Sequence, residues 1–191
     1  VITPAFDATG ERILFYVGSR GHHADIGGIT PGSMPANSKV VEEEGVLINN
    51  FQLVRDGQFL EAETVALLGS GRYPTRNIPQ NIADLQAQVA ANQKGVDELL
   101  KMVAHFGLGV VQAYMQHVQD NAEEAVRRVI TALKDSSYAY RLDNGALIQV
   151  AIRVDQTTRS AEIDFTGTSP QLDNNFNAPS AICMAAVLYV F

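Results

Sequence analysis

The sequence predicts an α+β fold, with mostly antiparallel strands at both ends of the chain and a central antiparallel helical hairpin packed on the sheet. Apolar residues recur every three or four positions over residues 80–133, which is the helical period. They alternate at Ile148, Val150, Ile152 and Val154, which is the strand period. The chain has 191 residues, 46% of them hydrophobic and 18% charged, so it is long enough for one hydrophobic core.

The amino-terminal part predicts a hairpin followed by loops. Residues 1–3 and 13–17 have strand character, and residues 4–10 between them supply turn formers. Two prolines and a glycine within residues 29–35 predict a loop, because proline continues neither a helix nor a central strand. Further on, residues 46–48 and 51–59 predict strands, and Asp56-Gly57 is a strong hairpin signal.

The central part predicts two helices, over residues 80–106 and 109–133. Gly107 and Gly109 lie between the two apolar series, which favours an antiparallel hairpin. Asn92 stands where the first series calls for an apolar residue, so it either fixes the register against a neighbour or hydrogen-bonds a ligand. Gly95 is expected to weaken the same helix by about 1 kcal/mol relative to alanine.

The carboxy-terminal part returns to strands, predicted over residues 138–142, 146–154 and 161–165. Asn144-Gly145 provides the hairpin signal between the first two. A loop rich in Asn, Thr and Ser then spans residues 166–179 and precedes an apolar helix. Its polar groups either hold a small polar substrate or an anion, or build the turns of the loop itself.

The candidate site follows the second predicted strand, in a glycine-bracketed loop that holds His22, His23 and Asp25. Imidazole nitrogen and carboxylate oxygen are the usual ligands of zinc, manganese and iron(II), and they also act as general acids and bases. In an extended segment His23 and Asp25 share a face, whereas adjacent His22 and His23 do not, so His23 with Asp25 is the favoured pair. The alternative is a loop in which these side chains hydrogen-bond the backbone.

Composition excludes several classes of protein. The formal net charge of −7 argues against binding to a phosphate backbone. A single cysteine, Cys183, excludes an internal disulfide and predicts a cytoplasmic location. No run approaches the roughly 20 apolar residues of a membrane span, and no signal peptide is recognisable. The phosphate-binding pattern GxxxxGK[ST] is absent from the chain.

Four segments resemble the hydantoinase B/oxoprolinase family over essentially the whole chain. They are residues 19–35, 77–92, 117–128, and 164–169 together with 175–179. The family includes the B component of ATP-dependent N-methylhydantoinase, the carboxy-terminal region of 5-oxoprolinase, and subunits of acetone and acetophenone carboxylases. The resemblance implies that residues 1–191 are an internal fragment of a single domain truncated at both ends, inactive on its own.

The resemblance also implies a division of labour between two components. An ATP-binding partner of the hydantoinase A type activates the carbonyl of a small cyclic amide, a hydantoin or a 5-oxoproline-like lactam, and the B-type component completes the hydrolysis of the C–N bond. His23 and Asp25, and less firmly His22, would be the catalytic and metal-binding residues, with manganese, zinc or iron as the metal. A hetero-oligomer is implied. Two alternatives remain, a subunit of an acetone carboxylase-like enzyme and a scaffold segment without catalytic residues.

Overall fold

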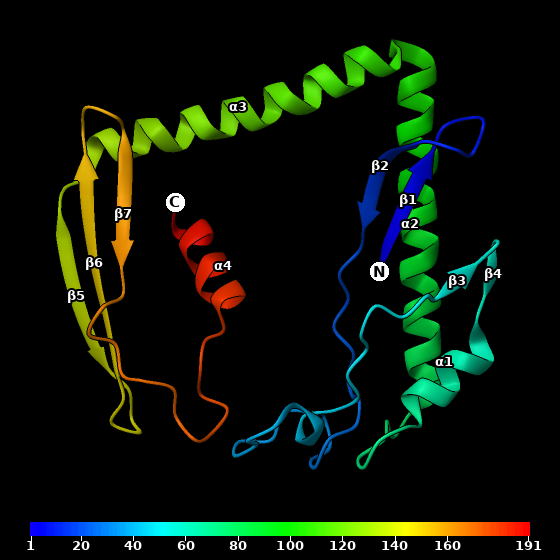
Figure 1. The fold of residues 1–191 in the computed structure, drawn as a ribbon, viewed down its shortest axis with the longest axis horizontal. Helices are drawn as coiled ribbons and strands as arrows, with labels where there is room; N and C mark the ends of the chain where they lie inside the picture. Colours follow the sequence, from blue (N-terminus) through cyan, green and yellow to red (C-terminus); the bar gives the residue numbers. More distant parts are fainter. The chain divides into compact units, whose positions relative to one another are not determined.

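The structure is a computed structural model that describes residues 1–191, and it divides into two compact units, Val1–Gly107 and Leu108–Phe191 (Figure 1). The α+β class predicted from the sequence is confirmed, with helices beside short antiparallel strands. The expectation of one sheet is wrong, because the strands form three separate sheets in the order β1-β2, β3-β4 and β5-β6-β7. No helix is both long and apolar enough to cross a membrane.

The first unit begins with the predicted hairpin, formed by β1 (Ile2–Phe6) and β2 (Ile13–Gly18). β1 continues through Pro4, which the sequence had placed in the turn. The turn instead starts at Asp7, whose carboxylate accepts hydrogen bonds from the backbone amide and hydroxyl of Thr9, at 3.1 and 2.7 Å. Ala5 and Phe15 are buried where the hairpin meets the helix behind it.

That helix is α2 (Ile78–Phe106), close to the predicted range. Asn77 caps its first turn by accepting a hydrogen bond from the amide of Gln80, and Pro79 occupies an early position where no amide donor is needed. Its buried face packs on β1, β2 and α1 (Glu61–Leu68), a short helix that the sequence pattern did not predict. Leu68, Ile82 and Leu85 form the core of this unit.

Two polar or small residues of α2 bind the hairpin closely. Asn92 is fully buried, and its Nδ2 donates to Val1 O and to Thr3 Oγ1, both at 3.1 Å. This supports its interpretation as a register residue. A Cβ on Gly95 would lie 2.8 Å from Cγ1 of Val17, so this glycine lets β2 approach the helix. Gly95 therefore has a packing role, beyond the loss of helix propensity expected from the sequence.

Residues 41–59 contain less strand than predicted. The acidic run lies in a short 3₁₀ helix, η1 (Val41–Glu43), and the predicted strand over residues 46–48 is absent. That prediction is wrong because Val46 donates its amide to Ile26 O at 2.8 Å, which joins the segment to a loop instead of a sheet. The predicted hairpin is confirmed by β3 (Val54–Arg55) and β4 (Gln58–Phe59), joined at Asp56-Gly57.

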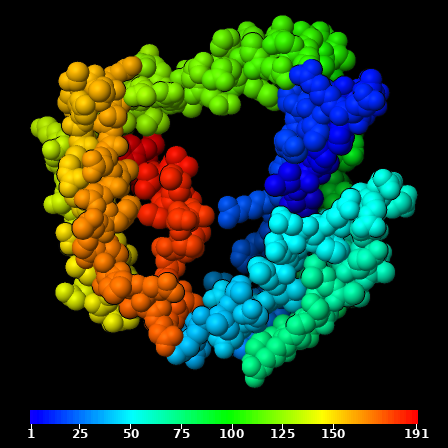
Figure 2. Space-filling view, in the orientation of Figure 1, coloured from blue at the N-terminus to red at the C-terminus, as the bar shows by residue number.

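The second unit contains α3 (Leu108–Ala132), β5 (Ser136–Arg141), β6 (Leu147–Asp155), β7 (Ser160–Asp164) and α4 (Ser180–Val190). These confirm the three predicted strands and the final helix. β5, β6 and β7, coloured from yellow-green to orange, lie side by side (Figure 2). Arg159 donates to Glu124 at 3.0 Å, which ties the β6–β7 turn to α3.

The two long helices meet at Gly107, which has a positive φ of 84° and separates the last residue of α2 from the first of α3. Their existence and approximate ranges are confirmed. Because they belong to different compact units, their antiparallel packing against each other stays a prediction.

Candidate functional site

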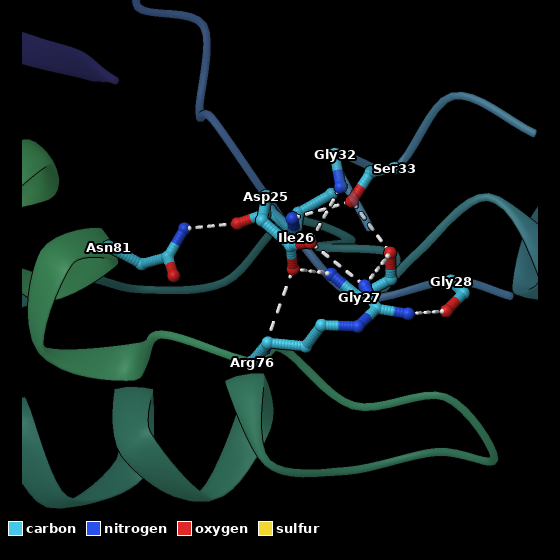
Figure 3. A network of polar contacts seen from close by, with 8 residues as sticks. All are labelled: Asp25, Ile26, Gly27, Gly28, Gly32, Ser33, Arg76 and Asn81. Atoms are coloured by element: carbon cyan, nitrogen blue, oxygen red, sulfur yellow. Dashed lines mark hydrogen bonds and ion pairs between the residues drawn. The ribbon is translucent and has the colours of Figure 1, made fainter. Parts of the chain in front are cut away.

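The chain leaves β2 at Gly18 and runs without helix or strand through residues 19–35, which we call the site loop. This loop contains the candidate residues His22, His23 and Asp25. Two side chains from downstream segments, Arg76 and Asn81, hold its middle (Figure 3). Nδ2 of Asn81 donates to Asp25 O at 2.8 Å.

Asp25 is the centre of a hydrogen-bond network. Its Oδ1 accepts from the amides of Gly27, at 2.9 Å, and Arg76, at 3.4 Å. Its Oδ2 accepts from the amide of Gly32, at 2.9 Å, and from Nη1 of Arg76, at 2.8 Å. Burial acts to raise the pKa of the Asp25 carboxyl, but these amides and the guanidinium outweigh it and hold the pKa below its ordinary value.

Arg76 forms a clamp on the site loop. Besides its ion pair with Asp25, its guanidinium donates to Gly27 O at 3.1 Å and to Gly28 O. The planar guanidinium presents several N–H donors in fixed directions, so one side chain satisfies a carboxylate and two carbonyls together. Sequence reasoning missed this residue, since Arg76 lies 51 positions from Asp25 and no local pattern marks it.

Gly27 and Gly28 pass between two other backbone segments. Both have positive φ, at 94° and 87°. A Cβ at Gly27 would lie 2.2 Å from Tyr73 O, and one at Gly28 would lie 2.7 Å from Glu43 O. The amide of Gly28 also donates to Tyr73 O, at 3.0 Å. These positions therefore require glycine for both conformation and space.

His23 points to a different partner from the one expected. Its Nδ1 lies 3.3 Å from Oδ2 of Asp84, on α2. The side chain is 13% exposed and lines a cavity of about 710 Å³, which Phe51, Leu53 and Gln88 also line. His22 is exposed, and its Nδ1 lies 2.8 Å from His23 O.

The structure does not pair His23 with Asp25. Asp25 accepts hydrogen bonds from the loop amides and from Arg76, whereas His23 contacts Asp84. No three His, Cys, Asp or Glu side chains gather into a group able to hold a metal ion. Both oxygens of Asp25 are already engaged, one of them by a cation, so the residues present do not fit a metal by themselves. A metal role for His22, His23 and Asp25 stays a prediction.

The second polar loop, residues 166–179, has side chains that serve its own backbone and that of β6. Asn177 accepts from the amide of Leu172 at 2.8 Å and donates to Leu172 O at 3.0 Å. Ser169 Oγ accepts from the amide of Leu147, and Thr168 Oγ1 from that of Gln149. These contacts favour the turn-building interpretation. The substrate-binding alternative stays a prediction.

The chain belongs to the hydantoinase B/oxoprolinase family, whose model matches residues 1–191. Among its relatives is 5-oxoprolinase 1 of Arabidopsis thaliana, 42% identical over 99% of this chain and 17% of its own length. The 5-oxoprolinase of Dictyostelium discoideum is 41% identical over 99% of this chain and 15% of its own length. A putative D-/L-hydantoinase component of a Pseudomonas species is 26% identical over 88% of this chain and 30% of its own length.

A solved structure agrees with this assignment. The ATP-dependent caprolactamase of Pseudomonas jessenii matches with a TM-score of 0.77 and 25% identity, over 98% of this chain and 32% of that one. The family thus includes ATP-dependent enzymes that act on cyclic amides. The chain spans about one sixth of the length of the 5-oxoprolinases it matches.

Proposed function

We propose that this chain is the B-type segment of an ATP-dependent 5-oxoprolinase, in which the site loop completes the opening of a five-membered lactam. The relatives named 5-oxoprolinase are 41–42% identical to it, whereas the hydantoinase component is 26% and the caprolactamase 25% identical. This difference favours 5-oxoproline as the substrate over a hydantoin or a seven-membered lactam.

The observation that carries the role of the site is the environment of His23. This imidazole is mostly buried beside a cavity of about 710 Å³, one ring nitrogen faces a carboxylate, and the other makes no hydrogen bond. An imidazole in that state is suited to accept a proton from water. We assign His23 as the general base and Asp25 with Arg76 as the pair that fixes the loop carrying it.

A lactam carbonyl is a poor electrophile, so activation must precede attack by water. In the proposed reaction a hydantoinase A-type partner, as a separate subunit or a domain of the same polypeptide, transfers the terminal phosphoryl group of ATP to the carbonyl oxygen. Water then adds to the activated carbon while His23 takes its proton, and the C–N bond breaks as the ring nitrogen leaves with a proton. This leaves an acyl phosphate at the opened end, and a second water cleaves it to the carboxylate and inorganic phosphate. The sequence lacks the phosphate-binding pattern, which supports assigning the ATP site to the partner.

Metal binding by these residues is an alternative to the role of His23 as a base, because a ring nitrogen bound to a metal cannot also take a proton from water. His22, His23 and Asp25 would contribute ligands only together with further ligands from outside residues 1–191, and Asp25 would have to exchange Arg76 for the ion. The metal content of the full-length protein tests this, with wild type beside Asp25→Ala, purified without chelator. Near-stoichiometric metal that the variant loses supports the assignment. Metal absent from both, also after refilling with manganese, zinc or iron, refutes it.

The function itself is tested by giving the full-length protein and its A-type component ATP with 5-oxoproline, hydantoin, caprolactam, or a ketone plus bicarbonate, in turn. When 5-oxoproline is the substrate, we expect phosphate and the ring-opened product to form together, and no product to form when ATP is omitted. Preference for another ring would replace the substrate assignment. Consumption of a ketone and bicarbonate, with no lactam opened, would overturn the hydrolase proposal in favour of a carboxylase.

A further inference from the structure

We infer that Asp84 is a positioning residue that fixes the orientation and the tautomer of the His23 imidazole. This inference rests on the proposed role of His23 as the base. Nothing in the sequence pattern links the two residues, which lie 61 positions apart. Asp84 is in the second turn of α2, the helix that packs against the β1-β2 hairpin from which the site loop emerges.

The two oxygens of Asp84 have different partners. Oδ2 lies 3.3 Å from Nδ1 of His23, and Oδ1 accepts a hydrogen bond from Nε2 of Gln80 at 2.8 Å. The Asp84 side chain is 34% exposed and that of His23 is 13% exposed, so the imidazole is the more buried partner. Gln80 thus restrains the carboxylate on one side while the carboxylate faces the imidazole on the other.

This arrangement decides which ring nitrogen carries the hydrogen. An ionised carboxylate only accepts hydrogen bonds, so Nδ1 of His23 must be the donor. In the neutral imidazole the lone pair then resides on Nε2, the nitrogen that makes no hydrogen bond in the structure. A general base needs that lone pair on the nitrogen that meets the water, and a carboxylate behind an imidazole is a common means of ensuring it.

A second Gln–Asp pair on the same helix provides a control for the contact between Asp84 and His23. Nε2 of Gln93 donates to Asp97 at 2.9 Å, the same Gln-to-Asp spacing of four residues as Gln80 and Asp84. Asp97 has no histidine beside it, so Asp97→Asn makes the same substitution in an equivalent helical pair without touching the site.

The test compares full-length wild type, Asp84→Ala, Asp84→Asn and Asp97→Asn. The tautomer of His23 is read from ¹⁵N shifts of labelled histidine, about two pH units above the ordinary histidine pKa of about 6.5, with the His23 signal assigned by its loss in His23→Gln. We expect hydrogen on Nδ1 in the wild type and Asp97→Asn. In Asp84→Ala it should move to Nε2, the form that a free side chain prefers. In Asp84→Asn, Gln80 holds the amide oxygen, so the NH₂ group faces His23 and demands a lone pair on Nδ1.

The same proteins are then assayed for ATP-dependent opening of 5-oxoproline. We expect kcat to fall about 10- to 100-fold in both Asp84 variants with KM little changed, and Asp97→Asn to match the wild type. An unchanged tautomer or an unchanged kcat in both Asp84 variants would overturn the inference. If the wild type opens no lactam, the proposed function fails on its own, and the tautomer measurement still decides whether Asp84 sets the state of His23.

Discussion

Replacing Arg76 by alanine removes the clamp that holds the site loop against the segment before α2. The change deletes one ion pair with Asp25 and two hydrogen bonds to the carbonyls of Gly27 and Gly28. A hydrogen bond to a charged group contributes about 1.5–3 kcal/mol when well shielded. The Arg76 side chain is 38% exposed, so solvent screening reduces this figure, and we expect a total loss of about 2 kcal/mol in local stability.

Amide hydrogen exchange of the full-length protein, read on peptides that cover residues 26–33, measures this loss directly. About 2 kcal/mol corresponds to roughly 30-fold faster exchange when opening is local. Arg72→Ala is the matched control, because Arg72 lies in the same segment but stacks on the ring of Tyr73, 5.1 Å from its centroid, and does not contact the loop. Arg76→Lys should fall between the two, since an ammonium keeps the charge without the guanidinium geometry. Equal protection in Arg76→Ala and Arg72→Ala would refute the clamp.

Three further predictions concern the loop and the helix behind it. The folded pKa of Asp25 lies below the ordinary value of 3.8, so its ionised form stabilises the protein above that pH, and the contribution disappears as pH falls from 3.8 through the lower folded pKa. Thermal unfolding midpoints between neutral pH and about pH 3 should therefore decline more steeply in the wild type than in Asp25→Asn, and parallel curves would contradict this. Gly27→Ala should destabilise the protein more than Gly32→Ala in the same melting assay. Both glycines have positive φ, but only at Gly27 would the new Cβ meet a backbone oxygen, that of Tyr73, at 2.2 Å. Similar losses in the two variants would show that space at Gly27 is unimportant. Gly95→Ala should destabilise the protein although alanine has the better helix propensity, because the new Cβ would meet Val17. Gly109→Ala has open space around it and should be neutral or stabilising by up to about 1 kcal/mol. A stabilised Gly95→Ala would contradict the close packing of β2 on α2.

The sequence predicted the elements whose signal is local. The period of the apolar residues located α2 and α3 to within two residues at their first positions, and the turn formers located the hairpins. It missed α1, whose eight residues carry only a weak apolar stripe, and it predicted a strand over residues 46–48, where apolar residues pair with the site loop. Short segments of this kind take their conformation from distant neighbours, which a local pattern does not contain.

The candidate site shows the same division. Glycines around two histidines and an aspartate marked the loop correctly as a special segment, but the pairing within it followed from assuming an extended backbone. In the structure Asp25 pairs with Arg76 and His23 lies against Asp84, and the loop turns just after them, at Gly27 and Gly28. Both partners come from the chain before and within α2, more than 50 positions away, and no spacing rule reaches that far.

The proposed role of His23 is tested most directly by the rate of ATP-dependent 5-oxoproline opening in full-length wild type, His23→Gln and His105→Gln, each with its A-type component. His105 is an exposed histidine at the end of α2, in edge-to-face contact with Phe106, so its replacement controls for loss of an imidazole as such. We expect His23→Gln to lose at least about 100-fold in kcat, the usual contribution of a general base, and His105→Gln to retain the wild-type rate. A wild-type rate in His23→Gln would contradict the assignment of His23 as the general base.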